Sequence, residues 1–281
     1  MKRLLLATDL SSRAERALDR AVRLARQHQS ELRVLIVVEG DLPPHLVDAQ
    51  RAEAERIFAE RLQPTAGDAK LLSSLSVAVG KPFAEVLREA ASWPADLIVI
   101  GAHRADALQD MFRGTTAERI IRQGHIPTLV VREQAAEDYR CAVVGIDFSL
   151  HALRATQCAF RLAPKAQFHL VHSFLSPFPH FLYGDIRGEA REVHTKAMDR
   201  AIDEELTALL ARFGDQVPPV NRLVVNGMAQ EVLLATVSQL NADLLVAGTH
   251  GRAGVAHAVL GSVAEDLLSQ APCDVLVAKA W

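Results

Sequence analysis

Cysteine and aromatic residues are scarce in this sequence, and the scarcity narrows the class of protein. Only three cysteines occur among 281 residues, and none forms a CxxC pair, which argues against a disulfide framework or a CxxC redox centre. Cys141 and Cys273 open apolar runs, where a buried structural thiol is the expected role. Aromatic residues make up 5% of the chain, so a cluster of four in one stretch is conspicuous: Phe174, Phe178, Phe181 and Tyr183.

The sequence also lacks a large charge surplus and a long apolar run. Its formal net charge is −3, which argues against a broad electrostatic surface for nucleic acid or membrane. No apolar run approaches the length of a transmembrane helix, and Met1–Arg3 lead directly into a strand-like run without a secretory signal. We therefore expect a cytoplasmic protein with no membrane span and no nucleic-acid partner.

Familiar catalytic and cofactor motifs are missing. Neither GxxxxGK(S/T) nor GxGxxG occurs, which disfavours P-loop hydrolysis and dinucleotide redox chemistry. No spacing of Ser, His and Asp or of Cys and His indicates nucleophilic catalysis, so no catalytic residue is predicted. Four histidines cluster loosely without the spacing of zinc ligands, so no metal site is predicted either: His169, His172, His180 and His194.

A glycine-rich stretch, GTHGRAGVAHAVLGSV, occupies residues 248–263. It follows an apolar run at 243–247 that reads as a buried strand, and it leads into a helical pattern. Gly261 and Ser262 stand where the helix should begin, so free N–H groups and a partial positive charge would face an anion. Glycine leaves room where a Cβ would block a ligand. The stretch predicts a backbone cradle for phosphate, although its glycines could also serve tight turns alone.

A weaker copy of this stretch occurs earlier in the chain. Residues 101–115 repeat residues 248–262 with a common offset of 147 residues, and both copies follow an apolar run. Arg104 stands in the first copy where the second has Gly251. The shared offset indicates an internal duplication, which divides a chain of this length into two domains of ordinary size.

Strand-like and helix-like runs alternate through both copies. The first copy has apolar runs at 4–7, 32–38, 75–79, 96–100 and 128–131. The second copy restarts with runs at 142–147, 168–172, 223–225, 243–247 and 275–278. Continuous apolar strands separated by helices are typical of a parallel sheet covered on both faces. The sequence therefore predicts an α/β fold with two domains, at residues 1–134 and 139–281, joined by a polar connection.

The second copy is longer between its second and third strands, by about 13 residues on our alignment of the two copies. The extra length falls in a segment that includes Ser173–Tyr183 and therefore the aromatic cluster. An apolar loop of this kind could form a lid, a pocket wall or an interface, or it could pack on a long helix near 189–213.

With these motifs in tandem, the sequence resembles the universal stress protein family in its two-domain form. The resemblance rests on a strand ending in Asp147 followed by Ser149, on the glycine stretch, and on a closing apolar strand at 274–278. It implies that each domain is a doubly wound sheet of about five parallel strands in the order 3-2-1-4-5. It also implies ATP binding at the carboxyl ends of the first and fourth strands, a topological switch point.

The resemblance assigns roles to individual residues of the second domain. Asp147, next to Ser149, would stand near the adenine or ribose, and the backbone around Ser173 would read the adenine edge; a local turn is the alternative role of the aspartate. The ribose and phosphates would be wrapped by Gly248, His250, Gly251 and Arg252. The phosphate oxygens would accept hydrogen bonds from Gly261, Ser262 and Val263.

The first domain matches the same pattern only in part. The matching positions are Asp9, Gly101, Gly114 and Thr115. Arg104 does not match, because its side chain would occupy space that the pattern leaves for the ligand, although its guanidinium could instead bind a phosphate. We expect the second domain to bind nucleotide, and the first to bind weakly or not at all.

Three functions fit these observations. The first is a stress-response sensor or adaptor that binds ATP, with or without Mg²⁺. The second is a slow ATPase or an autophosphorylating enzyme with Ser262 or a nearby hydroxyl as the phosphate acceptor. Hydrolysis is expected to be slow because the sequence shows no dedicated base, metal carboxylate pair or arginine finger. The third is a binder of a larger phosphorylated, partly apolar ligand that contacts Phe174–Tyr183. The two domains could pair through their last strands, 128–131 and 275–278, and a homodimer stays open.

Overall fold

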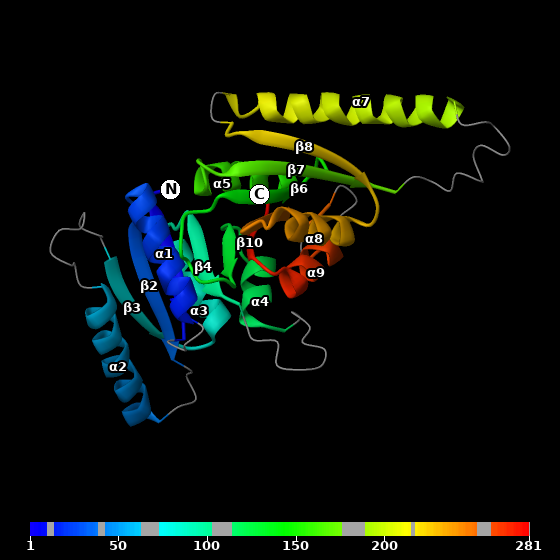
Figure 1. The fold of residues 1–281 in the computed structure, drawn as a ribbon. Helices are drawn as coiled ribbons and strands as arrows, with labels where there is room; N and C mark the ends of the chain where they lie inside the picture. The colour runs from blue at the N-terminus through cyan, green and yellow to red at the C-terminus, as the bar shows by residue number, and fades with distance from the viewer. Residues whose placement is uncertain are drawn as a thin grey trace.

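The computed structural model describes residues 1–9, 14–38, 43–62, 73–102, 114–175, 189–214, 217–251 and 260–280. They form two α/β units that share one sheet (Figure 1). The strands are β1 (Arg3–Thr8), β2 (Glu31–Val38), β3 (Ser73–Val79), β4 (Leu97–Gly101), β5 (Thr128–Val131), β6 (Cys141–Gly145), β7 (Gln167–Phe174), β8 (Val220–Asn226), β9 (Leu244–Gly248) and β10 (Asp274–Ala278). The helices are α1 (Ala14–His28), α2 (Pro44–Leu62), α3 (Pro82–Ser92), α4 (Thr116–Gln123), α5 (Leu150–Leu162), α7 (Glu189–Ala211), α8 (Ala229–Leu240) and α9 (Ser262–Gln270).

The sheet has ten strands in the order β3-β2-β1-β4-β5-β10-β9-β6-β7-β8. Within each half the strands are parallel and follow the order 3-2-1-4-5, so the predicted doubly wound architecture is confirmed. The two halves join through β5 and β10, which pair antiparallel with Leu129 opposite Leu276. The predicted pairing of the last strands is therefore correct, and it turns two sheets into one.

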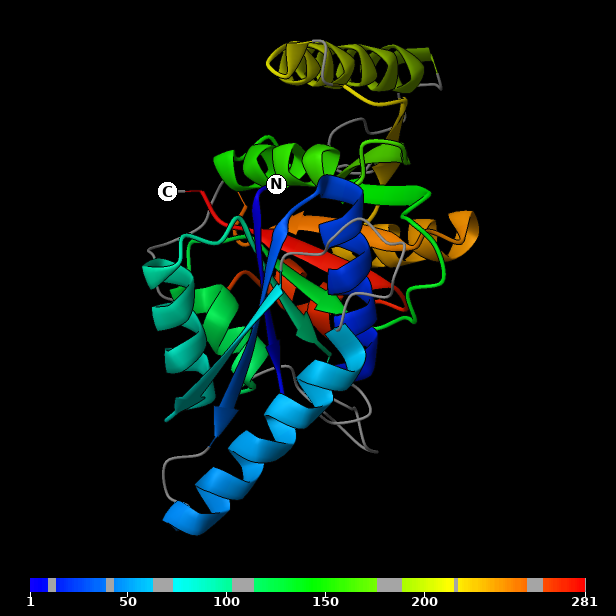
Figure 2. The same ribbon diagram turned by 90° about the vertical axis from the view of Figure 1, so that its left-hand side faces the viewer.

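Helices cover both faces of this sheet. Because successive strand residues point to opposite faces, Leu4 and Leu6 of β1 join one core while Leu5 joins the other. The first core includes residues of α1, α5 and α7, with Phe58 of α2 packed against it. The second core takes its helical residues from α3, α4, α8 and α9. Figure 2 shows α2 and α7 at opposite ends of the molecule. None of the helices described is long and apolar enough to cross a membrane.

Several element boundaries differ from the sequence expectation. β6 ends at Gly145, so Asp147 lies two residues beyond the strand that we expected it to close. β8 is longer than the apolar run 223–225, because this partly exposed edge strand also includes the polar residues Asn221, Arg222 and Asn226. Cys273 is buried as expected, whereas Cys141 is only partly buried because it is the first residue of β6.

An aspartate clamps the start of the first strand in each domain. The Asp96 carboxylate, just before β4, accepts hydrogen bonds from the backbone N–H groups of Lys2 (2.5 Å) and Arg3 (3.1 Å). Asp243, just before β9, does the same for Arg140 (2.9 Å) and Cys141 (3.1 Å). The duplication therefore preserved a side-chain contact, not only a hydrophobic pattern.

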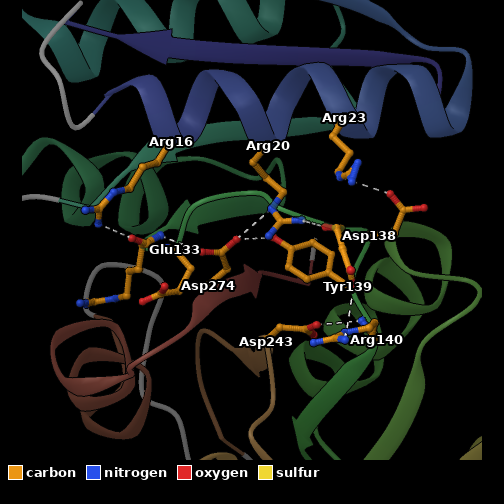
Figure 3. A network of polar contacts seen from close by, with 11 residues as sticks. Arg16, Arg20, Arg23, Glu133, Asp138, Tyr139, Arg140, Asp243 and Asp274 are labelled. Carbon is orange, nitrogen blue, oxygen red and sulfur yellow. Dashed lines mark hydrogen bonds and ion pairs between the residues drawn. The ribbon is translucent and has the colours of Figure 1, made fainter.

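The connection between the domains is held by a network of polar contacts (Figure 3). Its centre is the Asp274 carboxylate, which is fully buried at the start of β10. It accepts hydrogen bonds from the Tyr139 hydroxyl (2.6 Å) and from Arg20 Nε of α1 (3.2 Å). The Arg20 guanidinium also lies 4.0 Å from the centre of the Tyr139 ring. The polar connection predicted between the two domains thus ends in a buried tyrosine that joins it to both domains.

Candidate functional site

The carboxyl ends of β6 and β9 bring the predicted site residues of the second domain to one edge of the sheet. The two strands are parallel neighbours, with Val144 opposite Val246, so Asp147 and Gly248 leave the sheet side by side. α5 begins at Leu150 and is capped by Ser149, whose hydroxyl accepts a hydrogen bond from the N–H of Ala152 (3.1 Å). This edge is the crevice where doubly wound folds bind ligands.

The loop after β6 and the loop after β9 contact each other through side chains named from the sequence. The Ser149 hydroxyl donates to the His250 carbonyl at 3.2 Å. Asp147 Oδ1 accepts the N–H of Ser149 at 2.9 Å, and a Cβ added to Gly251 would lie 2.9 Å from Asp147 Oδ2. The local turn, which is the alternative role of Asp147, is thus present, and the second carboxylate oxygen is the atom nearest to a Cβ at Gly251.

Backbone strain accompanies this arrangement at Phe148, between Asp147 and Ser149. Phe148 has φ of +60°, which is unusual for a bulky side chain. Its ring lies 4.9 Å from the His172 ring of β7, and His172 Nδ1 donates to the Ile146 carbonyl at 2.7 Å. Residues in such conformations persist where the surroundings fix them, and they cluster at functional sites.

Two of the motif glycines are required by close packing. A Cβ on Gly248 would lie 2.8 Å from backbone atoms of His151 and Ala152, where α5 starts. A Cβ on Gly261 would lie 2.9 Å from the Thr249 carbonyl oxygen, which accepts the Gly261 N–H at 2.9 Å. The N–H of Gly261 is therefore engaged within the motif, so Ser262 and Val263 are the remaining predicted donors at this point.

The amino end of α9 offers those donors. Ser262 begins the helix, and Gly261 caps it without a side-chain hydrogen bond. The first N–H groups of a helix have no partner within the helix and carry its positive dipole end. The Ser262 side chain is exposed beside them. Gly261, just before this helix end, is hydrogen-bonded to Thr249. The turn that begins at Thr249 also contacts Asp147 and Ser149.

Thr249 lies within the candidate site and was not predicted from the sequence. It is 2% exposed, and its N–H donates to the Ala278 carbonyl of β10 at 3.1 Å. Its hydroxyl lies 3.1 Å from His151 Nδ1 and 3.0 Å from His250 Nδ1. Thr249 therefore ties β9, β10, α5 and α9 together at the motif. Its place between Gly248 and His250 was the only sequence signal.

The remaining predicted positions divide into two groups. Ser173 lies near the end of β7, half buried, with Val225 of β8 as its register partner, at the same edge of the sheet. Arg252 lies outside the described residues, as do residues 176–183 of the aromatic segment. Phe174 is the last residue of β7, and its carbonyl accepts the N–H of Gly227 at 2.9 Å.

The corresponding edge of the first domain differs in detail. Asp9 follows β1 and Gly101 ends β4, and these two strands are parallel neighbours. Thr115 caps α4 by accepting the Glu118 N–H at 3.1 Å, while the buried Glu118 carboxylate accepts the N–H of Gly114 at 2.5 Å. The position of Thr249 is taken by Ala102, which keeps the backbone bond to β5 (2.8 Å, to Val131) but has no hydroxyl. Arg104 lies outside the described residues.

The edge of the second domain offers polar groups that can bind a ligand. It offers one carboxylate, a helix amino terminus and hydroxyl groups, which match the hydroxyls and phosphates of a nucleotide. Within the part of the chain that the structure describes, no group of three or more His, Cys, Asp or Glu side chains could hold a metal ion. The cysteines lie elsewhere, and burial raises the pKa of Cys141 and raises that of Cys273 to about 12.

Comparison with known proteins identifies the family. The model of the universal stress protein family matches residues 1–132 and again residues 138–279. The chain therefore belongs to the universal stress protein family, in tandem form. This membership supports a role in the stress response.

Individual relatives agree with this assignment. Universal stress protein E of Escherichia coli is 27% identical over 220 residues, a match that covers 71% of this chain and 65% of that protein's length. A universal stress protein of Mycolicibacterium smegmatis is 26% identical over 298 residues, covering 98% of this chain and 96% of the relative. The crystal structure of a universal stress protein from Archaeoglobus fulgidus superposes with a TM-score of 0.69 at 21% identity, covering 99% of this chain and 98% of that one, and shares the fold.

Proposed function

We propose that the protein binds ATP or a related nucleotide at the carboxyl edge of the second domain's sheet, and acts as a cytoplasmic sensor or adaptor in the stress response. The observation that carries this proposal is the meeting of two loops at one helix amino terminus. Asp147 approaches Gly251, and Ser149 binds the His250 carbonyl (3.2 Å), beside the start of α9.

The residues present fit the parts of a nucleotide. The N–H groups of Ser262 and Val263 and the Ser262 hydroxyl would bind phosphate oxygens, which the dipole of α9 favours. The Asp147 carboxylate would accept hydrogen bonds from ribose hydroxyls, as the resemblance implies. The end of β7 at Ser173 would supply backbone groups for the base. With no cluster of metal ligands found among the described residues, hydrolysis would be slow.

The second domain would be the principal site. Its motif turn is fixed through the Thr249 hydroxyl, whereas the first domain has Ala102 there. In the first domain the N–H of Gly114 is already bonded to the Glu118 carboxylate, which places a negative charge where phosphate would bind. The second domain also has a glutamate at the equivalent position of α9, Glu265, so this charge alone does not distinguish the two domains. The missing hydroxyl at Ala102 is therefore the stronger argument for a principal site in the second domain.

Calorimetric titration of the full chain with ATP, with and without Mg²⁺, tests the proposal. We expect one site per chain. Asp147→Asn should weaken ATP binding roughly tenfold, since it removes a charged acceptor of hydrogen bonds. Its matched control in the first domain is Asp9→Asn, which should leave stoichiometry and affinity unchanged. Two equivalent sites would overturn the asymmetry, and absence of binding to the folded wild type would overturn the function.

Mass spectrometry of small molecules that copurify with the protein provides a second test. The comparison is with Gly261→Val, whose side chain would meet the Thr249 carbonyl oxygen (2.9 Å from a Cβ at that position). ATP or ADP in the wild type alone would support the proposal. Phosphate release and incorporation should be measured on the same samples. Turnover above background that disappears in Ser262→Ala would favour an autophosphorylating enzyme instead.

One observation favours a second candidate, a phosphorylated ligand with an apolar part. Three large apolar side chains are exposed at the same edge of the second domain: Leu150 (65%), Leu175 (65%) and Met228 (43%). Leu150 follows the site residue Ser149, and Leu175 follows β7. If such a ligand copurifies, Leu175→Ser should release it and leave ATP affinity unchanged; equal retention by the variant would exclude this candidate.

A further inference from the structure

His151, a residue outside the predicted motif, connects α5 to the motif turn and to the end of the chain's last strand. It is the second residue of α5. Its Nδ1 accepts a hydrogen bond from the backbone N–H of Ala280 at 2.9 Å, just beyond β10. The same nitrogen lies 3.1 Å from the hydroxyl of Thr249, and the ring centre lies 5.1 Å from that of His250.

The direction of each hydrogen bond follows from the bond to Ala280. A backbone N–H can only donate, so His151 Nδ1 carries no proton and the neutral ring is protonated on Nε2. The Thr249 hydroxyl can only donate to this nitrogen, where it shares the single lone pair with the Ala280 N–H, and it then accepts from His250 Nδ1 (3.0 Å). The two imidazoles thus hold opposite tautomers on either side of the hydroxyl of Thr249, a residue that is 2% exposed.

We propose that His151 is a positioning residue that holds the Thr249–His250 turn in its binding conformation only while its Nδ1 is unprotonated. Protonation of Nδ1 would turn the shared acceptor into a donor that faces the N–H of Ala280. The Thr249 hydroxyl would then lose its acceptor while still buried, which is costly for a polar group. His151 therefore makes nucleotide binding sensitive to acidification, and this consequence rests on the nucleotide site proposed above.

The charged groups around His151 belong to several elements. His250 faces its ring from the motif turn. Asp147 has one carboxylate oxygen next to Gly251, and its other oxygen accepts a hydrogen bond from the Ser149 N–H. Arg154 stands three residues on along α5, and Lys279, next to Ala280, donates from Nζ to the Arg122 carbonyl at 3.3 Å. Because the two imidazole rings contact the same Thr249 hydroxyl, the experiment must separate the two histidines.

Asparagine at position 151 makes this separation. Its Oδ1 is attached as Nδ1 is in histidine and has two lone pairs, so it could accept from both Ala280 and Thr249 without titrating. Alanine removes the acceptor altogether. At pH 7.5, His151→Ala should weaken ATP binding by about tenfold, and His151→Asn should bind at least as tightly as the wild type. His250 is left intact in both variants.

Titrations at pH 7.5 and pH 5.5 provide the deciding comparison, made between variants at each pH because ATP itself titrates. Histidine titrates near pH 6.5 when unperturbed, so the wild type should lose more affinity on acidification than His151→Asn does. Equal losses in the two proteins would assign the pH dependence to another group and overturn the proposal. Loss of affinity in His151→Asn at pH 7.5 would overturn it as well.

A spectroscopic test does not depend on nucleotide. Nitrogen-15 NMR of the full chain should show His151 protonated on Nε2 and His250 protonated on Nδ1 at pH 7.5. The amide proton of Ala280 should shift as His151 titrates in the wild type, and should not shift in His151→Asn. Reversed tautomers, or an Ala280 amide proton whose chemical shift does not change with pH in the wild type, would overturn the positioning role. If these signals agree but ATP does not bind, the nucleotide proposal alone fails.

Discussion

Replacing Asp274 by alanine should lower the free energy of unfolding by about 3–5 kcal/mol, the usual cost of removing one partner from a buried ion pair. Its carboxylate has no exposed surface and accepts four hydrogen bonds. The donors are the N–H groups of Arg132 (2.7 Å) and Glu133 (3.0 Å), the Tyr139 hydroxyl (2.6 Å) and Arg20 Nε (3.2 Å).

The partners that remain set the expected value within that range. The side chain of Arg20 is 5% exposed, so its charge would be left buried. Arg20 would keep the Glu137 carbonyl (2.9 Å) and the face of Tyr139, which favours the lower end. Burial, and then the charge of Asp274, raise the pKa of Tyr139 well above its usual value, so its hydroxyl stays protonated and would lose its acceptor.

Urea unfolding of the full chain, followed by circular dichroism, measures the effect. Asp274→Asn should fall between wild type and alanine, because it keeps one acceptor but no charge. The control is Arg56→Ala, which breaks exposed ion pairs with Glu53 and Glu60 and should not change stability measurably. A loss below about 1 kcal/mol in Asp274→Ala would refute the reasoning, because it would make this network equivalent to surface pairs.

Three further perturbations probe other parts of the structure. Burial lowers the pKa of His28, whose Nε2 donates to the Leu162 carbonyl (2.9 Å) across the domains. As the pH falls, the unfolded chain therefore takes up the proton before the folded chain does, and the free energy of unfolding should fall below about pH 6.5. Unfolding measured at pH 7.5 and 5.5 should show a smaller loss of stability in His28→Gln than in the wild type. Gly248→Ala should cost about 1–3 kcal/mol in urea unfolding, because its Cβ would meet backbone atoms of α5 at 2.8 Å, and an unchanged midpoint would contradict this packing. Because burial raises the pKa of Cys273 to about 12, a thiol reagent at pH 7.5 should modify it only in urea; modification in the native protein would disprove its burial.

The fold was predictable because its signals repeat. Continuous apolar runs such as 97–100 and 244–247 are buried on both faces of the sheet, and composition alone marks such strands. The shared offset of the glycine stretches then fixed the number of domains. The order of the strands came from the family resemblance, since periodicity carries no information about which strands are neighbours.

Contacts between distant residues were not predictable in the same way. Thr249 and His151 are 98 positions apart, and neither residue type nor local spacing indicates that they meet. Arg20 and Asp274 are separated by 254 positions, and both occur in segments that read as ordinary helix and strand. Asp147, Ser149 and Gly251 were predicted as one site from the family resemblance, which agrees with the general rule that parallel strands place their carboxyl ends together. Their roles toward a ligand remain predictions.

The antiparallel junction gives the first domain a structural role even if it binds no ligand. β10 is buried along its length, with Val275 and Leu276 fully covered, and β5 satisfies its outer backbone groups. Residues 138–281 expressed alone would expose this apolar edge, which is a template for pairing with another strand. We expect this half to dimerise through β10, in the same antiparallel manner in which β10 pairs with β5. Sedimentation measurements that find only monomer at all concentrations would contradict this.

Asp274 provides a sharper form of the same test, because one substitution should act with opposite signs in the two proteins. In the isolated half, Asp274 keeps Tyr139 but loses Arg20, Arg132 and Glu133 as donors, since these precede residue 138. An ionised carboxylate at a buried strand edge would then oppose pairing. Asp274→Asn should therefore strengthen association of the half while it destabilises the full chain. A weaker dimer in the asparagine variant would contradict this prediction. It would show that the first domain does not serve to compensate the negative charge of Asp274.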